Sequence, residues 1–150
     1  MKNSQFNKIY EKKCDVCGKI VAVSKTGNGE CKNCGWYNNR LGEMNEDKII
    51  FPNLVSLNKA KRLYKDKKTF KPDLNDFLEM LSSYSEVEFW YKGLNYCLSL
   101  RDCADKKIEF GCNPSNICYF IDKDDFIQNA KIGNEYLKNI WDKVENPKYI

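Results

Sequence analysis

The chain of 150 residues contains no histidine. This absence excludes the Ser-His and Cys-His pairs of many nucleophilic enzymes and every histidine-bound zinc. A general base would have to be a carboxylate, a lysine, a tyrosine or a cysteine, which disfavours an enzyme of any kind. We therefore expect a protein that is not an enzyme.

Long apolar runs are also missing. No stretch approaches the roughly 20 apolar residues that a membrane-spanning helix needs, and the first residues, MKNSQFNKIYEKKC, lack the apolar core of a secretory signal. We expect a cytoplasmic protein that has no membrane partner. In that reducing compartment, the eight cysteines are better explained as free thiols and metal ligands than as disulfides.

Four of the cysteines form two Cys-x2-Cys pairs with thirteen residues between them: Cys14, Cys17, Cys31 and Cys34. Each tight turn presents two sulfurs, and a hairpin of this length brings the second pair back to the first. Four thiolates at about 2.3 Å are the ligand set of a structural zinc ion. Because the protein fills all four positions, we expect zinc to stabilise the fold rather than to catalyse a reaction.

The other four cysteines, Cys97, Cys103, Cys112 and Cys118, match no such spacing. They fit independent thiols in or beside strands, where cysteine serves as a small apolar residue. A second zinc site and a disulfide across a sheet remain as alternatives.

The first half of the chain reads as a metal-binding segment followed by helices. Residues 1–13 are a polar lead-in, and a β-hairpin that begins with a strand over residues 20–23 separates the two cysteine pairs. Ser56 is the expected N-cap of a helix that runs to about Lys68, and Asp73 is the expected cap of a second helix.

From Glu86 onward, apolar residues alternate with polar ones, which predicts strands. A turn at Lys92-Gly93 places Phe89 opposite Tyr96, so that the apolar side chains of both strands share one face. Further elements are expected as strands over residues 108–110 and 117–121, a short helix capped by Asp122 or Asp124, and a last helix capped by Asn134.

These elements predict an α+β protein. We expect a four-cysteine zinc ribbon over residues 1–52, a helical connector over residues 53–85, and a small antiparallel sheet covered by C-terminal helices over residues 86–150.

The segment from the cysteine pairs to the first helix, residues 12–70, resembles the bacterial cysteine-rich proteins of the CPCC type. The matching positions are Cys14, Cys17, Cys31, Cys34, Trp36, Asn53, Ser56, Leu57, Ala60 and Tyr64. The sequence departs from the Cys-Pro-Cys-Cys motif at Cys14-Asp15-Val16-Cys17, but it keeps four ligands. The resemblance implies zinc binding. Residues 86–150 are similar to small bacterial domains that end in a Leu-x-x-Ile-Trp helix.

Three functions fit these features. The first is a module that binds another protein, by analogy with immunity proteins and inhibitors of bacterial or phage conflict systems. Trp90 is then either an exposed anchor for the partner or a residue covered by helices.

An enzyme is the third and weakest hypothesis, because it depends on Asp122, Asp124 and Asp125 binding a divalent cation instead of capping a helix.

The second hypothesis is nucleic-acid binding by the basic segment 59–71. Residues 1–85 carry a net charge of +6 and residues 86–150 a net charge of −2, so an anionic partner would prefer the first part. The candidate phosphate contacts are Lys59, Lys61, Arg62, Lys65 and Lys68. A solvated helix face explains the same residues.

Overall fold

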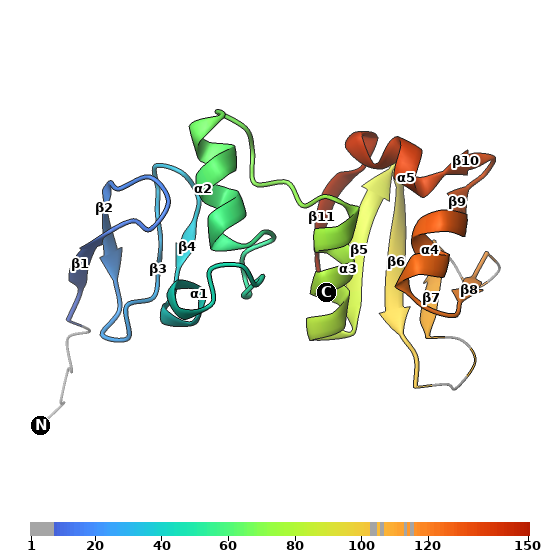
Figure 1. Cartoon of the computed structure of the whole chain (residues 1–150), viewed down its shortest axis with the longest axis horizontal. Helices are drawn as coiled ribbons and strands as arrows, with labels where there is room; N and C mark the ends of the chain where they lie inside the picture. The colour runs from blue at the N-terminus through green and yellow to red at the C-terminus, as the bar shows by residue number, and fades with distance from the viewer. Residues whose placement is uncertain (1–7, 103–104, 106, 113, 115) are drawn as a thin grey trace, which may run out of the picture. The chain divides into compact units, whose positions relative to one another are not determined.

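The computed structural model of the chain describes residues 8–102, 105, 107–112, 114 and 116–150. It contains two compact units, unit 1 (Met1–Phe70) and unit 2 (Lys71–Ile150) (Figure 1). Their boundary lies inside the segment that the sequence analysis treats as a helical connector. Helix α2 (Leu57–Lys65) belongs to unit 1, and α3 (Leu74–Tyr84) belongs to unit 2. In the part of the chain that the structure describes, no helix is both long and apolar enough to cross a membrane.

Unit 1 begins with two short antiparallel hairpins. Strand β1 (Tyr10–Lys13) pairs with β2 (Ile20–Val23), and β3 (Gly29–Glu30) pairs with β4 (Tyr37–Asn38). The strand expected over residues 20–23 is confirmed. Its partner is β1, which lies within the expected polar lead-in. Val21 and Val23 of β2 are buried in the core, and the polar strand β1 pairs with the edge of β2.

Two helices complete unit 1, α1 (Arg40–Met44) and α2. Ser56 caps α2 as expected, since its hydroxyl accepts a hydrogen bond from the Lys59 N–H at 3.3 Å. The helix ends at Lys65, before the expected Lys68. Lys67 adopts a left-handed φ of 54°, and the N–H groups of Lys67 and Lys68 close a Schellman motif on the preceding turn, which stops the helix.

Unit 2 begins with α3, which Asp73 caps as the sequence predicts. The Asp76 N–H donates to Asp73 Oδ1, and the Asp73 N–H donates to Asp76 Oδ2, both at 2.9 Å. The helix packs against a five-stranded antiparallel sheet of order β11-β5-β6-β7-β8. The strands are β5 (Glu86–Tyr91), β6 (Leu94–Leu100), β7 (Ile108–Gly111), β8 (Cys118–Phe120) and β11 (Glu145–Tyr149).

The register of β5 and β6 confirms the expected hairpin. Phe89 pairs with Tyr96, and Lys92 and Gly93 form the turn, both with positive φ. The buried face of the sheet carries Phe89 and Phe110, whose rings meet side chains of α3 and of α4 (Lys123–Asn129). Both helices therefore cover the same face of the sheet.

Trp90 lies on the opposite face and is 39% exposed, so helices do not bury it. Of the two alternatives for this residue, the structure shows the exposed one. Its strand neighbour Glu88 is half-buried on the same face, where the ammonium of Lys148, at 2.9 Å, lowers the pKa of the Glu88 carboxyl.

The C-terminal segment differs from the expectation. In place of a long helix capped by Asn134, the chain forms a small hairpin of β9 (Lys131–Ile132) and β10 (Glu135–Tyr136), one turn of helix α5 (Leu137–Ile140), a 3-10 turn η1 (Trp141–Lys143) and the edge strand β11. Lys71 secures this region, because its ammonium donates to the carbonyl oxygens of Trp141, Asp142 and Val144 at 3.2, 2.9 and 2.6 Å.

Candidate metal centre

The two Cys-x2-Cys pairs lie in the turns of the two hairpins of unit 1. We call these turns the first Cys loop (residues 14–18) and the second Cys loop (residues 31–35). Both have the same backbone hydrogen bonds: the Gly18 N–H donates to Cys14 O at 3.0 Å, and the Gly35 N–H donates to Cys31 O at 2.7 Å. In both, the N–H of the first cysteine donates at 2.8 Å to the carbonyl oxygen of the residue after the glycine.

Glycine is needed at the end of each Cys loop for its backbone conformation. Gly18 has a φ of 71° and Gly35 a φ of 76°, in the left-handed region that other residues rarely adopt. Each loop therefore reverses the chain tightly and holds its two sulfurs on the same side.

The four sulfurs of the two loops converge on one point. Cys14 Sγ lies 3.7 Å from Cys34 Sγ, Cys17 Sγ lies 3.5 Å from Cys31 Sγ, and all four lie within 4.8 Å of one another. A regular tetrahedron with metal–sulfur bonds of about 2.3 Å has sulfur–sulfur edges of about 3.8 Å. A disulfide would need about 2.05 Å. The spacing therefore fits a shared metal ion, and these four cysteines could hold one.

The thiols of this cluster differ in how easily they ionise. Burial raises the pKa of Cys17, but hydrogen bonds from the Lys19 N–H and the Asn33 side chain, with those of the neighbouring thiols, lower it to about 7. Burial raises the pKa of Cys14 despite N–H groups that point at its sulfur, and burial together with the neighbouring thiols raises that of Cys34. Four sulfurs packed this closely need a cation to hold them all as thiolates.

A buried asparagine joins the first Cys loop to the second hairpin. Asn38 is fully buried, and its Oδ1 accepts a hydrogen bond from the Asp15 N–H of the first Cys loop at 2.9 Å. Its Nδ2 donates to Gly29 O of β3 at 3.1 Å and, at 3.4 Å, to the carbonyl oxygen of Trp36, the residue just before β4. Nothing in the sequence analysis singles out Asn38; its only sequence signal is its place at the end of the second hairpin.

The sulfurs also form part of the core of unit 1. Cys14 and Cys31 are buried together with residues of β2, the second hairpin and α2: Val21, Val23, Trp36, Val55, Leu57 and Ala60. The edge of the Trp36 ring meets Phe70 at a centroid distance of 6.0 Å. Trp36, Leu57 and Ala60, which carry part of the resemblance stated above, therefore pack around the cysteines.

The structure does not bring the basic residues of segment 59–71 onto one free surface. Lys61 forms an ion pair with Glu46 at 3.2 Å, and Lys59 is half-buried. Arg62 and Lys65 are exposed on α2, whereas Lys68 lies beyond the end of the helix. Lys71 binds carbonyl oxygens in unit 2. Part of the basic segment is therefore engaged in contacts within the protein.

The remaining cysteines lie in unit 2, and those that the structure describes form no cluster that could share a metal ion. Cys97 is half-buried, its thiol donates to Asn95 Oδ1 at 3.2 Å, and burial raises its pKa. Cys112 is half-buried and Cys118 is exposed. Cys103 lies outside the described residues.

Of the aspartates after β8, Asp122 caps α4 and Asp125 bonds to the residues around it, whereas Asp124 lies in the first turn of the helix. Asp122 Oδ1 accepts a hydrogen bond from the Asp125 N–H at 2.8 Å at the start of α4. The Asp125 carboxylate accepts one from the Ile121 N–H at 2.9 Å and one from Asn129 Nδ2 at 2.7 Å. Among the described residues, the four-cysteine cluster is the one group of three or more such side chains close enough to share a metal ion.

The fold and the site define a protein of mixed α and β structure with a four-cysteine cluster able to bind a metal ion. Comparison with protein-family models, with curated proteins and with solved structures found no match.

Proposed function

We propose that this protein is a non-enzymatic, zinc-binding module that recognises another protein. The observation that carries the proposal is the convergence of four cysteine sulfurs within 4.8 Å inside the core of unit 1. Tetrahedral sites of four sulfurs suit zinc or iron, and zinc is the usual ion where the site stabilises a fold. The ligands are Cys14, Cys17, Cys31 and Cys34.

The hairpin arrangement supports a zinc ribbon of the CPCC type. Each cysteine pair lies in the turn of its own antiparallel hairpin, and the second hairpin leads through a buried asparagine, Asn53, to a helix capped by Ser56. Zinc with four thiolates carries a net charge of −2. Backbone N–H groups directed at the sulfurs of Cys14, Cys17 and Cys34 stabilise this negative charge.

A closed site of this kind leaves no position for water or substrate, so the zinc supplies stability and no reaction step. The chain has no histidine to serve as a base elsewhere. Function then belongs to the surfaces that the metal holds in place. An immunity protein or inhibitor in bacterial or phage conflict is the kind of protein-binding module that we propose.

Exposed apolar side chains support a protein partner. Unit 1 exposes Leu41, Met44 and Phe51, and unit 2 exposes Trp90. Aromatic residues and methionine are enriched in protein interfaces. The alternative, a nucleic-acid-binding zinc ribbon, keeps the exposed cations Arg62, Lys65 and Lys68 as its support, but its basic segment is interrupted by ion pairing at Lys61.

Affinity capture from the source cell distinguishes the two partners. We expect the zinc-loaded full chain to retain a specific protein after nuclease treatment and in high salt, and the purified protein to bind again in isolation. A Cys17→Ser/Cys34→Ser variant, which lacks two ligands, should not retain it. Capture that disappears with nuclease or falls steeply with salt would instead indicate nucleic acid.

A further inference from the structure

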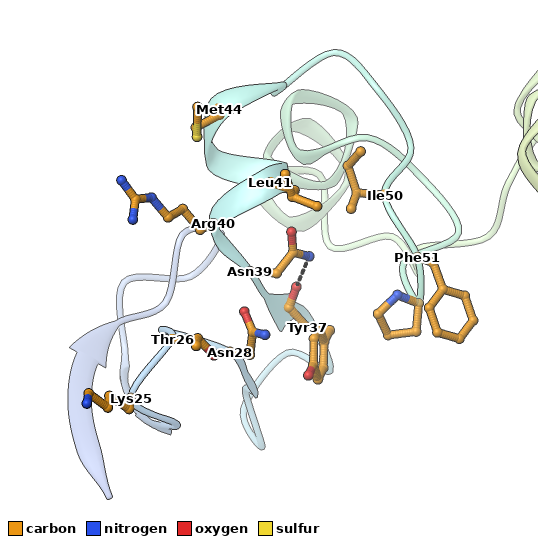
Figure 2. Close-up of a pocket in the computed structure, with 11 residues that line it drawn as sticks. Lys25, Thr26, Asn28, Tyr37, Asn39, Arg40, Leu41, Met44, Ile50 and Phe51 are labelled. Atoms are coloured by element: carbon orange, nitrogen blue, oxygen red, sulfur yellow. Dashed lines mark hydrogen bonds between the residues drawn. The ribbon is translucent and has the colours of Figure 1, made fainter.

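Unit 1 contains a groove beside α1, which we call the α1 groove. It has a volume of about 950 Å³. Arg40, Leu41 and Met44 of α1 line it from one direction, Lys25 lines it from the turn after β2, and Ile50 and Phe51 line it from the loop that follows α1 (Figure 2). All these residues belong to unit 1, and none is a ligand of the metal centre.

Three of the apolar side chains that line the groove are exposed to solvent. Met44 is 70% exposed, Leu41 62% and Phe51 49%. Isolated exposed apolar residues are common on protein surfaces, but a group that lines one hollow is typical of a binding site. Methionine adapts to apolar partners of different shape, because its side chain is flexible and polarizable.

The charge of the groove is positive. Among the described residues that line the groove, Lys25 and Arg40 are the only charged ones, and neither forms an ion pair with another described residue. The nearest acid on α1, Glu43, pairs with Lys12 instead. A partner with carboxylates beside its apolar side chains would match both the surface and the charge.

Asparagine side chains hold the walls of the groove in place. Asn39 Oδ1 accepts a hydrogen bond from the Gly42 N–H at 2.6 Å, which caps α1, and Asn39 Nδ2 donates to Tyr37 O at 3.4 Å (Figure 2). Asn53, just after the loop with Phe51, binds both the N–H of Tyr37, at 3.1 Å, and its carbonyl oxygen, at 2.8 Å. Strand β4 thus fixes both walls, and a preformed groove binds at a smaller entropic cost.

The same strand connects the groove to the metal centre. Strand β4 follows the second Cys loop after one residue, Trp36, and Asn38 at its end accepts a hydrogen bond from the Asp15 N–H of the first Cys loop. Loss of the metal would therefore disturb the strand from which both walls are held.

We propose that the α1 groove binds a segment of a partner protein whose apolar side chains are flanked by aspartate or glutamate. This inference rests on the proposed function and names the chemistry of its partner. A single-stranded nucleic acid fits less well, because only two of the described lining residues, Tyr37 and Phe51, offer its bases a ring on which to stack, whereas the exposed Leu41 and Met44 match apolar side chains of a protein.

Selection from a library of short random peptides tests the proposal directly. The zinc-loaded full chain is the target, and we expect the selected peptides to combine leucine, isoleucine or phenylalanine with aspartate or glutamate. Leu41→Asp and Arg40→Glu should each weaken binding about tenfold or more in fluorescence polarisation. Amide NMR spectra and zinc content of each variant establish that unit 1 is still folded.

Matched variants outside the groove serve as controls. Ile20 is apolar and 62% exposed, the same fraction as Leu41, so Ile20→Asp should leave peptide binding unchanged. Arg62 is an exposed arginine on α2, and Arg62→Glu should also have no effect. Removal of the zinc should abolish binding by the unmodified chain.

The outcomes separate this inference from the proposed function. Selected peptides that bind Leu41→Asp and Arg40→Glu as tightly as the unmodified chain would overturn the groove but keep a protein-binding role. A library that yields no binder would overturn the groove, and the capture experiment then decides the broader proposal. An oligonucleotide that binds in a manner sensitive to Arg40→Glu would overturn both.

Discussion

Removal of the metal ion is expected to unfold unit 1 and to leave unit 2 folded. Among the described residues of unit 1, the hydrophobic cluster at the metal centre has eight buried members, two of which are the cysteines Cys14 and Cys31. A core this small rarely stabilises a fold alone, and zinc binding contributes on the order of 10 kcal/mol to such sites. Because whole domains are stable by only about 5–15 kcal/mol, loss of the ion should exceed what unit 1 can withstand.

Amide NMR spectra of the full chain, recorded before and after treatment with a strong chelator near neutral pH, measure this effect. The signals of residues in unit 1 should collapse to the narrow range of an unfolded chain, while those of α3 and the five-stranded sheet keep their positions. Restoring zinc should restore the spectrum. A variant with Cys97, Cys112 and Cys118 replaced by serine should respond in the same way as the unmodified chain, because those thiols lie outside the cluster.

Phe89→Ala is expected to destabilise unit 2 by about 4 kcal/mol. Phe89 is fully buried at the centre of an aromatic cluster. Its ring lies 5.4–6.2 Å, between centroids, from the rings of Phe77, Tyr96, Phe110 and Trp141. Truncation leaves a cavity that these four rings, held by three different strands or helices and a 3-10 turn, are poorly placed to fill.

The adjacent residue provides the matched control. Trp90 has a side chain of greater size but points to the other face of the sheet, so Trp90→Ala should cost less than about 1 kcal/mol. Denaturant unfolding followed by amide signals of unit 2 assigns the transition to this unit. A similar loss of stability in the two variants would contradict the burial of Phe89 on one face of the sheet and the exposure of Trp90 on the other.

The sequence predicts the parts of unit 2 in which local pattern and packing agree. Alternation in β5 and β6 and the turn at Lys92-Gly93 specify the pairing of Phe89 with Tyr96, because a shift of one residue would expose every apolar side chain. The cap at Asp73 is equally local, since the capping box involves only residues 73–76.

The C-terminal strand β11 is not predictable in this way. It has no alternating pattern, and Pro147 removes one backbone donor, which suits only an edge strand or a bulge. Its pairing with β5 joins segments far apart in the chain. The apolar spacing of Leu137, Ile140 and Trp141 fits a helix, but in the structure one turn of α5 and a 3-10 turn are enough to bury all three.

The same distinction applies to the site. The Cys-x2-Cys spacing identifies Cys14, Cys17, Cys31 and Cys34 because each pair needs only a local turn, and the structure brings the four together. The role of Asn38 and the existence of the α1 groove depend on contacts between hairpins, a helix and a loop, which no local pattern reveals.

We propose that four thiolates hold one zinc ion in a closed site that stabilises unit 1. X-ray absorption at the zinc edge, measured on the purified full chain with its metal content, tests it most directly. We expect one zinc per chain with four sulfur ligands at about 2.3 Å and no nitrogen or oxygen ligand. A shell that contains oxygen or nitrogen, or a folded unit 1 in protein that holds no metal, would contradict it.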